Sequence, residues 1–141
     1  MKLARILAAG LLLAGCGNKT PPVAPELVQP REAASLSATS TTGGVQLVWR
    51  RPTEYTGGKR MNDLGGFEIE RAPGGTGPEA FVQIGDFQLS EEQRFRQDRR
   101  LEWTDATAAP GATYRYRIIG YTLDGYRSKP AGPVTITFTP P

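Results

Sequence analysis

The most informative segment for the fold is "TYRYRIIGYT", Thr113 to Thr122, in the last third of a chain of 141 residues. Within it, two interleaved sets of side chains alternate: Tyr114, Tyr116 and Ile118 with Arg115, Arg117 and Ile119. A period of two places successive side chains on opposite faces of an extended backbone. The stretch therefore predicts a β-strand with one buried face.

The same alternation recurs along the chain. It is clear in residues 45–50, 67–70 and 134–139, and weaker in residues 35–39, 81–85 and 101–104. The chain has 17 glycines and 12 prolines, and clusters such as "APGGTGPE" and "AAPGAT" separate the candidate strands as turns. Seven short strands in residues 35–141 need two sheets that cover each other's apolar faces. We expect an all-β, seven-stranded antiparallel sandwich.

The order of these features resembles the fibronectin type III family over nearly all of residues 35–141. "VQLVWRRP" is similar to the second strand of that family, with Trp49 as the core tryptophan, and "LGGFEIERA" to the third, with Phe67 and Ile69 pointing inward. "APGATYRYRIIGYTLDGYRSKPAGPVTIT" resembles the last two strands. The resemblance implies an immunoglobulin-like sandwich in which the hydroxyl of Tyr114 bonds the backbone near the preceding turn.

Two segments depart from the family pattern. A long connection, "RPTEYTGGKRMNDLGG", follows the second strand, and a charged insert, "LSEEQRFRQDRR", precedes the fifth. The insert leaves the strand boundaries between Gly85 and Leu101 open. The basic run from Arg94 to Arg100 within this insert predicts a solvated loop. The alternative is a docking site for an acidic partner.

Residues 1–15 have the layout of a signal peptide: Lys2 and Arg5 precede a short apolar run and small residues. About ten apolar residues cover only half of a roughly 30 Å hydrocarbon core, which argues against a permanent membrane span. The residues Leu13, Ala14, Gly15 and Cys16 resemble the bacterial lipoprotein signal motif. That resemblance implies cleavage before Cys16 and anchoring to the membrane through lipid on its thiol. An ordinary secretory peptide with a chance cysteine, or a buried core cysteine, are the alternatives.

The lipoprotein resemblance also bears on location. Gly17 stands where an aspartate would favour inner-membrane retention, so in a Gram-negative source we expect the outer membrane, facing the periplasm, with the cell surface left open. Residues 16–34 would form the lipidated cysteine and a disordered linker, in which four prolines prevent helix and strand pairing: Pro21, Pro22, Pro25 and Pro30. Residues 35–141 would form the fibronectin type III-like domain.

Composition excludes several kinds of chemistry. The chain has no histidine, the side chain most used for acid–base work and metal binding, so we expect no enzyme, no metal and no cofactor. Of 17 basic residues, Lys2 and Arg5 leave with the signal peptide, which leaves 15 against 14 acidic residues and little motive for nucleic-acid binding. "GGTG" and "GGKR" do not complete a phosphate-loop pattern.

Two sets of side chains that could carry chemistry have a simpler interpretation. The loop carboxylates show no metal-ligand or acid–base spacing, and we expect solvated surface for Glu54, Asp63, Glu91, Glu92, Asp98, Asp105 and Asp124. The alternation places an aromatic set in the core rather than at a sugar site: Trp49, Trp103, Tyr114 and Tyr116.

One candidate interaction site follows from the family topology. The loop after the second strand and the loop between the last two strands would meet at the end of the sandwich nearest the lipid. The side chains expected there are Arg51, Tyr55, Lys59, Arg60, Tyr126 and Arg127. Such a pole would touch anionic head groups or a membrane-associated partner. We expect a non-catalytic protein-interaction or scaffold module at the cell envelope, with a carbohydrate- or peptidoglycan-binding adhesin as the alternative.

Overall fold

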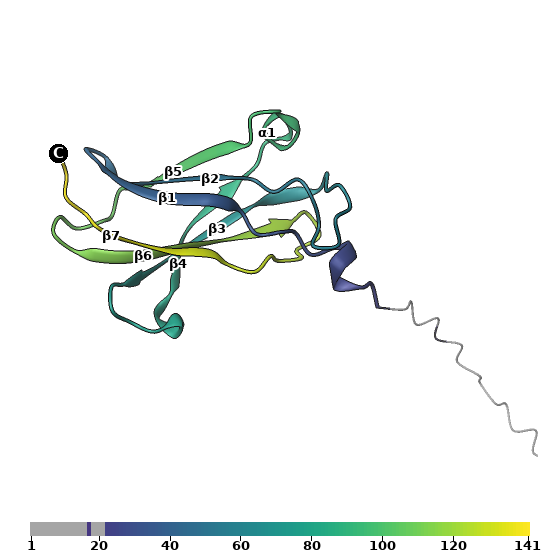
Figure 1. Cartoon of the computed structure of the whole chain (residues 1–141), viewed down its shortest axis with the longest axis horizontal. Helices are drawn as coiled ribbons and strands as arrows, with labels where there is room; N and C mark the ends of the chain where they lie inside the picture. The colour runs from purple at the N-terminus through teal and green to yellow at the C-terminus, as the bar shows by residue number, and fades with distance from the viewer. Residues whose placement is uncertain (1–16, 18–21) are drawn as a thin grey trace, which may run out of the picture.

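A computed structural model describes residue 17 and residues 22–141, so Leu13, Ala14, Gly15 and Cys16 lie outside the described residues. Within these described residues, seven strands form two antiparallel sheets (Figure 1). One sheet has the order β1-β2-β5 and the other the order β4-β3-β6-β7. The strands are β1 (Ala34–Thr41), β2 (Gly44–Arg50), β3 (Leu64–Pro73), β4 (Val82–Gln88), β5 (Arg100–Asp105), β6 (Thr113–Thr122) and β7 (Ala131–Thr137). The predicted all-β, seven-stranded sandwich is confirmed.

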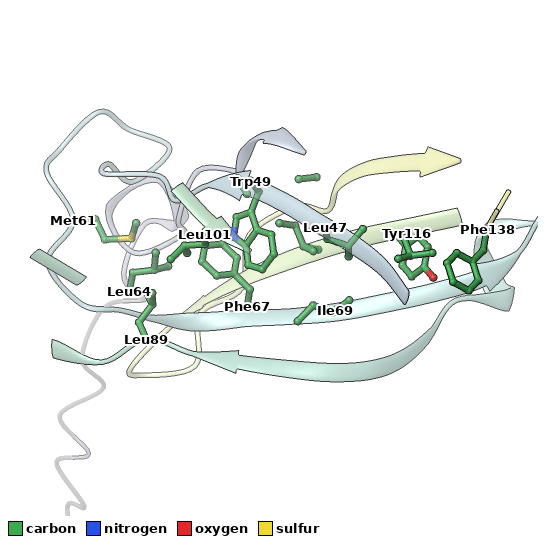
Figure 2. Close-up of a cluster of buried hydrophobic side chains, with 14 residues drawn as sticks. Leu47, Trp49, Met61, Leu64, Phe67, Ile69, Leu89, Leu101, Tyr116 and Phe138 are labelled. Atoms are coloured by element: carbon green, nitrogen blue, oxygen red, sulfur yellow. The ribbon is translucent and has the colours of Figure 1, made fainter. Parts of the chain in front are cut away.

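The core lies between the two sheets and is centred on Trp49. Its ring meets those of Phe67 and Phe87 edge to face, each with ring centroids 5.5 Å apart. Figure 2 shows Leu47 and Trp49 of β2 facing Phe67 and Ile69 of β3 across the interior, and all four side chains are fully buried. Each such side chain contributes about 1.5–3 kcal/mol on burial, so the alternation read from the sequence supplies the core that joins the sheets.

Tyr114 forms the corner that the family resemblance predicts. The backbone N–H of Ala109, in the turn before β6, donates to its hydroxyl oxygen at 2.8 Å. Tyr116, two residues on, is fully buried, whereas Tyr114 and Trp103 are partly buried and pack against the core. The four aromatic residues assigned to the core therefore lie in it or against it.

The charged insert is ordered. It forms the short helix α1 (Glu91–Phe95), which begins with a capping box: the N–H of Gln93 donates to Ser90 Oγ at 3.1 Å, and the N–H of Ser90 donates to Gln93 Oε1 at 2.9 Å. Arg94 donates from Nε to the carbonyl oxygen of Leu64 at 2.7 Å and ties the helix to the start of β3. The boundaries that the sequence left open are thus the end of β4 at Gln88 and the start of β5 at Arg100.

The segment before β1 differs from the expected extended linker. A 3-10 turn, η1 (Pro25–Leu27), opens it, and Pro30 is buried in an isolated bridge to Tyr55. The carbonyl oxygens of Glu26 and Gln29 accept the N–H groups of residues 57 and 56, each at 2.9 Å. The prediction that the prolines prevent pairing is therefore wrong from Pro25 onward. Proline lacks an N–H, but it fits the first turn of a helix and its neighbours keep their carbonyl acceptors.

Candidate functional site: the N-terminal pole

Three segments lie together at the end of the sandwich where the chain leads into β1 (Figure 1). They are residues 22–33, the connection 51–63 and the loop 123–130, and we call them the N-terminal pole. The N–H of Leu123 donates to the carbonyl oxygen of Asp63 at 2.8 Å, and Gln29 Nε2 donates to that of Arg127 at 3.3 Å. The structure thus brings both predicted loops together with the segment that precedes the sandwich.

The six predicted pole residues have different environments. Lys59 and Arg60 are exposed on the connection 51–63, and Tyr126 is 43% exposed on the opposite loop. Arg127 is exposed and paired with Glu68 of β3. Tyr55 is partly buried, and its hydroxyl donates to Asp63 Oδ1. Burial and this hydrogen bond raise the pKa of Tyr55 to about 12.

Arg51 does not belong to the exposed surface of the pole, and its placement there is corrected. It is only 7% exposed, because its side chain turns inward under α1. It donates from Nε to the carbonyl oxygen of Gln93 at 3.1 Å and from Nη2 to that of Arg96. Arg51 therefore anchors the insert to the connection 51–63.

The pole carries both signs of charge. Arg31 pairs with Glu54 at 2.9 Å across the contact between the segment 22–33 and the connection 51–63. Such exposed pairs contribute about 0–1 kcal/mol, so their main effect is to offset local charge. The pole as a whole is therefore mixed in charge rather than basic.

A hollow of about 400 Å³ beside the pole has a very different lining. It lies between the connection 51–63 and the insert, and we call it the arginine hollow. Its lining residues are Arg51, Thr53, Arg60, Met61, Asn62, Arg94, Phe95, Arg96, Gln97 and Arg99. The sequence shows the run from Arg94 to Arg100 but not that Arg60, more than thirty positions earlier, faces it. The arginine hollow could therefore not be predicted from the sequence.

Asp105 is buried, which corrects its assignment to solvated surface. Its carboxylate is 2% exposed and accepts from Arg71 Nη1 and Tyr116 Oη at 2.7 Å each, and from the N–H and Oγ1 of Thr107 at 3.0 and 2.6 Å. Burial alone would raise the pKa of Asp105, but these hydrogen bonds outweigh it and hold the pKa below its usual range. The group joins β5 of one sheet to β3 and β6 of the other and has a structural role.

Residues 22–141, with Gly17, contain no group of three or more Cys, Asp or Glu side chains placed to hold a metal ion. Over the same residues, no helix has the length and apolar character needed to cross a membrane.

Comparison with known proteins connects this architecture to solved structures. No protein family and no curated protein matches the chain in sequence. In structure, 79% of the chain resembles 17% of the twitchin kinase region from C. elegans, with a TM-score of 0.56 and 17% identity. The chain also resembles 33% of a multidomain fragment of titin, with a TM-score of 0.51 and 17% identity. It resembles 94% of an Fn3-like protein from Clostridium thermocellum, with a TM-score of 0.52 and 16% identity.

The chain thus spans a small part of the twitchin and titin fragments and almost the whole of the bacterial protein. At these identities the likeness concerns the fold. The chain has a fibronectin type III-like sandwich fold.

Proposed function

We propose that this chain is a lipid-anchored, non-catalytic protein-interaction or scaffold module of the bacterial cell envelope. Lipid on Cys16 would hold it to the membrane, with the outer membrane facing the periplasm as the proposed location. Its N-terminal pole would contact the partner.

The observation that carries this proposal is the composition of the pole. Two loops of a rigid sandwich present exposed side chains there, among them Lys59, Arg60 and Tyr126. Loops held by a rigid scaffold are where binding residues concentrate. Because the segment from Pro25 to Arg31 packs on the connection 51–63, an anchor upstream of it would lie on the side of this pole.

A carbohydrate- or peptidoglycan-binding adhesin remains the second candidate, with less support. Trp49 and Tyr116 are fully buried, so they offer no face for a sugar to stack on. Another hollow, of about 710 Å³, lies beside the segment 22–33, but among the described residues that line it none is aromatic. Capture of the purified chain by isolated cell wall, and not by outer-membrane proteins, would favour the adhesin.

The anchor is tested by lipid labelling. Cells that express the chain are grown with radiolabelled palmitate, and the purified chain is compared with a Cys16→Ser variant. We expect label and membrane fractionation for the wild-type chain and neither for the variant. Label on the variant, or an unlabelled wild-type chain, would contradict the proposed anchor.

The interaction surface is tested by photo-crosslinking in intact cells. A photoreactive amino acid replaces Tyr126 at the pole, and a matched control replaces Val82, which is 60% exposed at the start of β4. Val82 pairs with Arg71 near the end of β3, at the other end of the sandwich. We expect protein adducts from position 126 and not from position 82. Equal adducts from both positions, or none from position 126, would count against the pole.

A further inference from the structure

The arginine hollow joins two segments that are distant in sequence. Arg51 and Arg60 come from the connection after β2, and Arg94, Arg96 and Arg99 come from the insert between β4 and β5. No acidic residue is among those that line it. Five arginine residues therefore line a space of about 400 Å³.

Three of these arginines, Arg51, Arg94 and Arg96, form hydrogen bonds that hold them in place, and most of their charge is not cancelled. Arg51 and Arg94 donate to backbone carbonyl oxygens, which are neutral acceptors. Arg96 pairs with Glu92 at 2.7 Å, one turn earlier on the exposed side of the insert. Within residues 22–141, neither Arg60 nor Arg99 forms an ion pair. The hollow thus keeps an excess of positive charge.

Gathering like charges in a partly buried space has a cost that an anion would relieve. Burial, together with the charges of Arg99 and Arg60, lowers the pKa of Arg51, which is the expected sign for cations that repel one another. A planar guanidinium donates two parallel hydrogen bonds to a phosphate, and several guanidiniums can share its oxygens. The chemistry of the hollow therefore matches a phosphate group better than a single carboxylate.

Two of the remaining lining residues are apolar and could contact a carbon-containing group attached to the phosphate. Phe95 is 59% exposed at the hollow, and Met61 contributes an apolar wall. The volume is within the range of about 300–1,000 Å³ that is usual for small-ligand sites. The hollow thus has room for a phosphate together with the carbon-containing group that carries it.

We propose that the arginine hollow is a binding site for phosphate-bearing anions, with Arg60 and Arg99 as the two free guanidiniums that contact the phosphate. The phosphate could belong to a soluble phosphorylated compound or to the head group of a lipid, and the chemistry of recognition is the same. This site lies beyond the proposed protein-docking role of the pole, and either can fail without the other.

Binding is measured by calorimetric titration of the full chain in neutral detergent, at physiological salt, with inorganic pyrophosphate as the probe. The test variant is Arg60→Gln with Arg99→Gln. The matched control is Arg50→Gln with Lys129→Gln, which removes the same charge from exposed side chains that do not line the hollow. Since the charge-assisted bonds are lost only in the test variant, we expect its Kd to rise by at least about tenfold while the control stays within about twofold of wild type.

Arg60 is exposed, Arg99 is partly buried, and both lie outside the core cluster, so the variants should fold, and equal unfolding midpoints would verify this. No saturable binding of pyrophosphate by the wild-type chain, or equal weakening in test and control variants, would overturn the proposal.

Two further arms distinguish the source of the phosphate. Glucose 6-phosphate probes a soluble ligand, and phosphatidylcholine vesicles with or without phosphatidylglycerol probe a lipid head group. Binding in either arm that depends on Arg60 and Arg99 supports the site and identifies the source. Binding in neither arm would contradict the inference that the hollow takes a phosphate together with the carbon-containing group that carries it.

Discussion

Removal of the Tyr116 hydroxyl tests the buried group around Asp105. In wild type this hydroxyl donates to Asp105 Oδ2 at 2.7 Å from a fully buried ring. A Tyr116→Phe change keeps the ring and deletes one hydrogen bond to a carboxylate that is 2% exposed. Because hydrogen bonds to charged groups contribute about 1.5–3 kcal/mol, we expect the free energy of unfolding at pH 7 to fall by that amount.

The effect of Tyr116→Phe should depend on pH with a definite sign. The pKa of Asp105 is lowered in the folded chain, so between that value and the unfolded pKa of about 3.9 the unfolded chain binds more protons. The stabilisation is present above the unfolded pKa and is lost as pH falls through the folded pKa. Below about pH 4 the cost of the mutation should therefore shrink toward that of a neutral hydrogen bond, about 0.5–1.5 kcal/mol.

The assay is urea unfolding followed by tryptophan fluorescence, at pH 7 and in steps down to about pH 3. Tyr114→Phe is the matched control, because Tyr114 is on the same strand and its hydroxyl accepts from the N–H of Ala109, which does not titrate. Its cost should be about 0.5–1.5 kcal/mol and should not depend on pH. If Tyr116→Phe cost no more than Tyr114→Phe at pH 7, or cost the same at both ends of the pH range, the hydroxyl of Tyr116 would not stabilise an ionised Asp105 as stated.

Three further predictions concern packing, anchoring and ionisation. A Gly66→Ala change places a Cβ 2.3 Å from the carbonyl oxygen of Phe87, so it should lower the free energy of unfolding by about 1–3 kcal/mol in urea titrations. In the control Gly43→Ala the nearest atom to the new Cβ is 3.9 Å away, and the free energy of unfolding should stay within about 0.5 kcal/mol of wild type. Arg51→Met should speed amide hydrogen exchange in α1, since two carbonyl anchors are lost; unchanged exchange would contradict this. In an absorbance titration Tyr55 should ionise near pH 12, and Tyr55→Phe should remove that step. Because the pKa of Tyr55 is raised on folding, the stabilisation from its hydroxyl is complete below about pH 10 and should be lost as pH rises toward about 12. Ionisation of Tyr55 near pH 10 would contradict this prediction.

Local pattern was enough to predict the strands and the main core residues. The alternation around Trp49, Phe67 and Tyr116 requires only that one face of each strand be buried, and this holds whichever strands become neighbours. The corner hydrogen bond of Tyr114 was also predictable, because it spans five residues. The meeting of the two loops at one pole followed from the strand order implied by the family resemblance.

The sequence by itself could not predict features that depend on partners from distant segments. Asp105 looked like a solvated loop carboxylate, but Arg71 and Tyr116 on the opposite sheet supply the donors that make its burial possible. Pro25 and Pro30 looked like part of an extended linker, yet the connection 51–63 offers N–H groups to the carbonyls around them.

The arginine hollow shows the same division. The sequence determined a basic run from Arg94 to Arg100 and, separately, an exposed Arg60. That they border one space depends on tertiary structure, because Arg51 bonds a carbonyl of the insert and holds it to the connection 51–63, while Arg94 bonds the carbonyl of Leu64 at the start of β3. The sequence shows which residues are charged, but the distances between those charges depend on how distant segments pack, and these distances set the strength of the interaction.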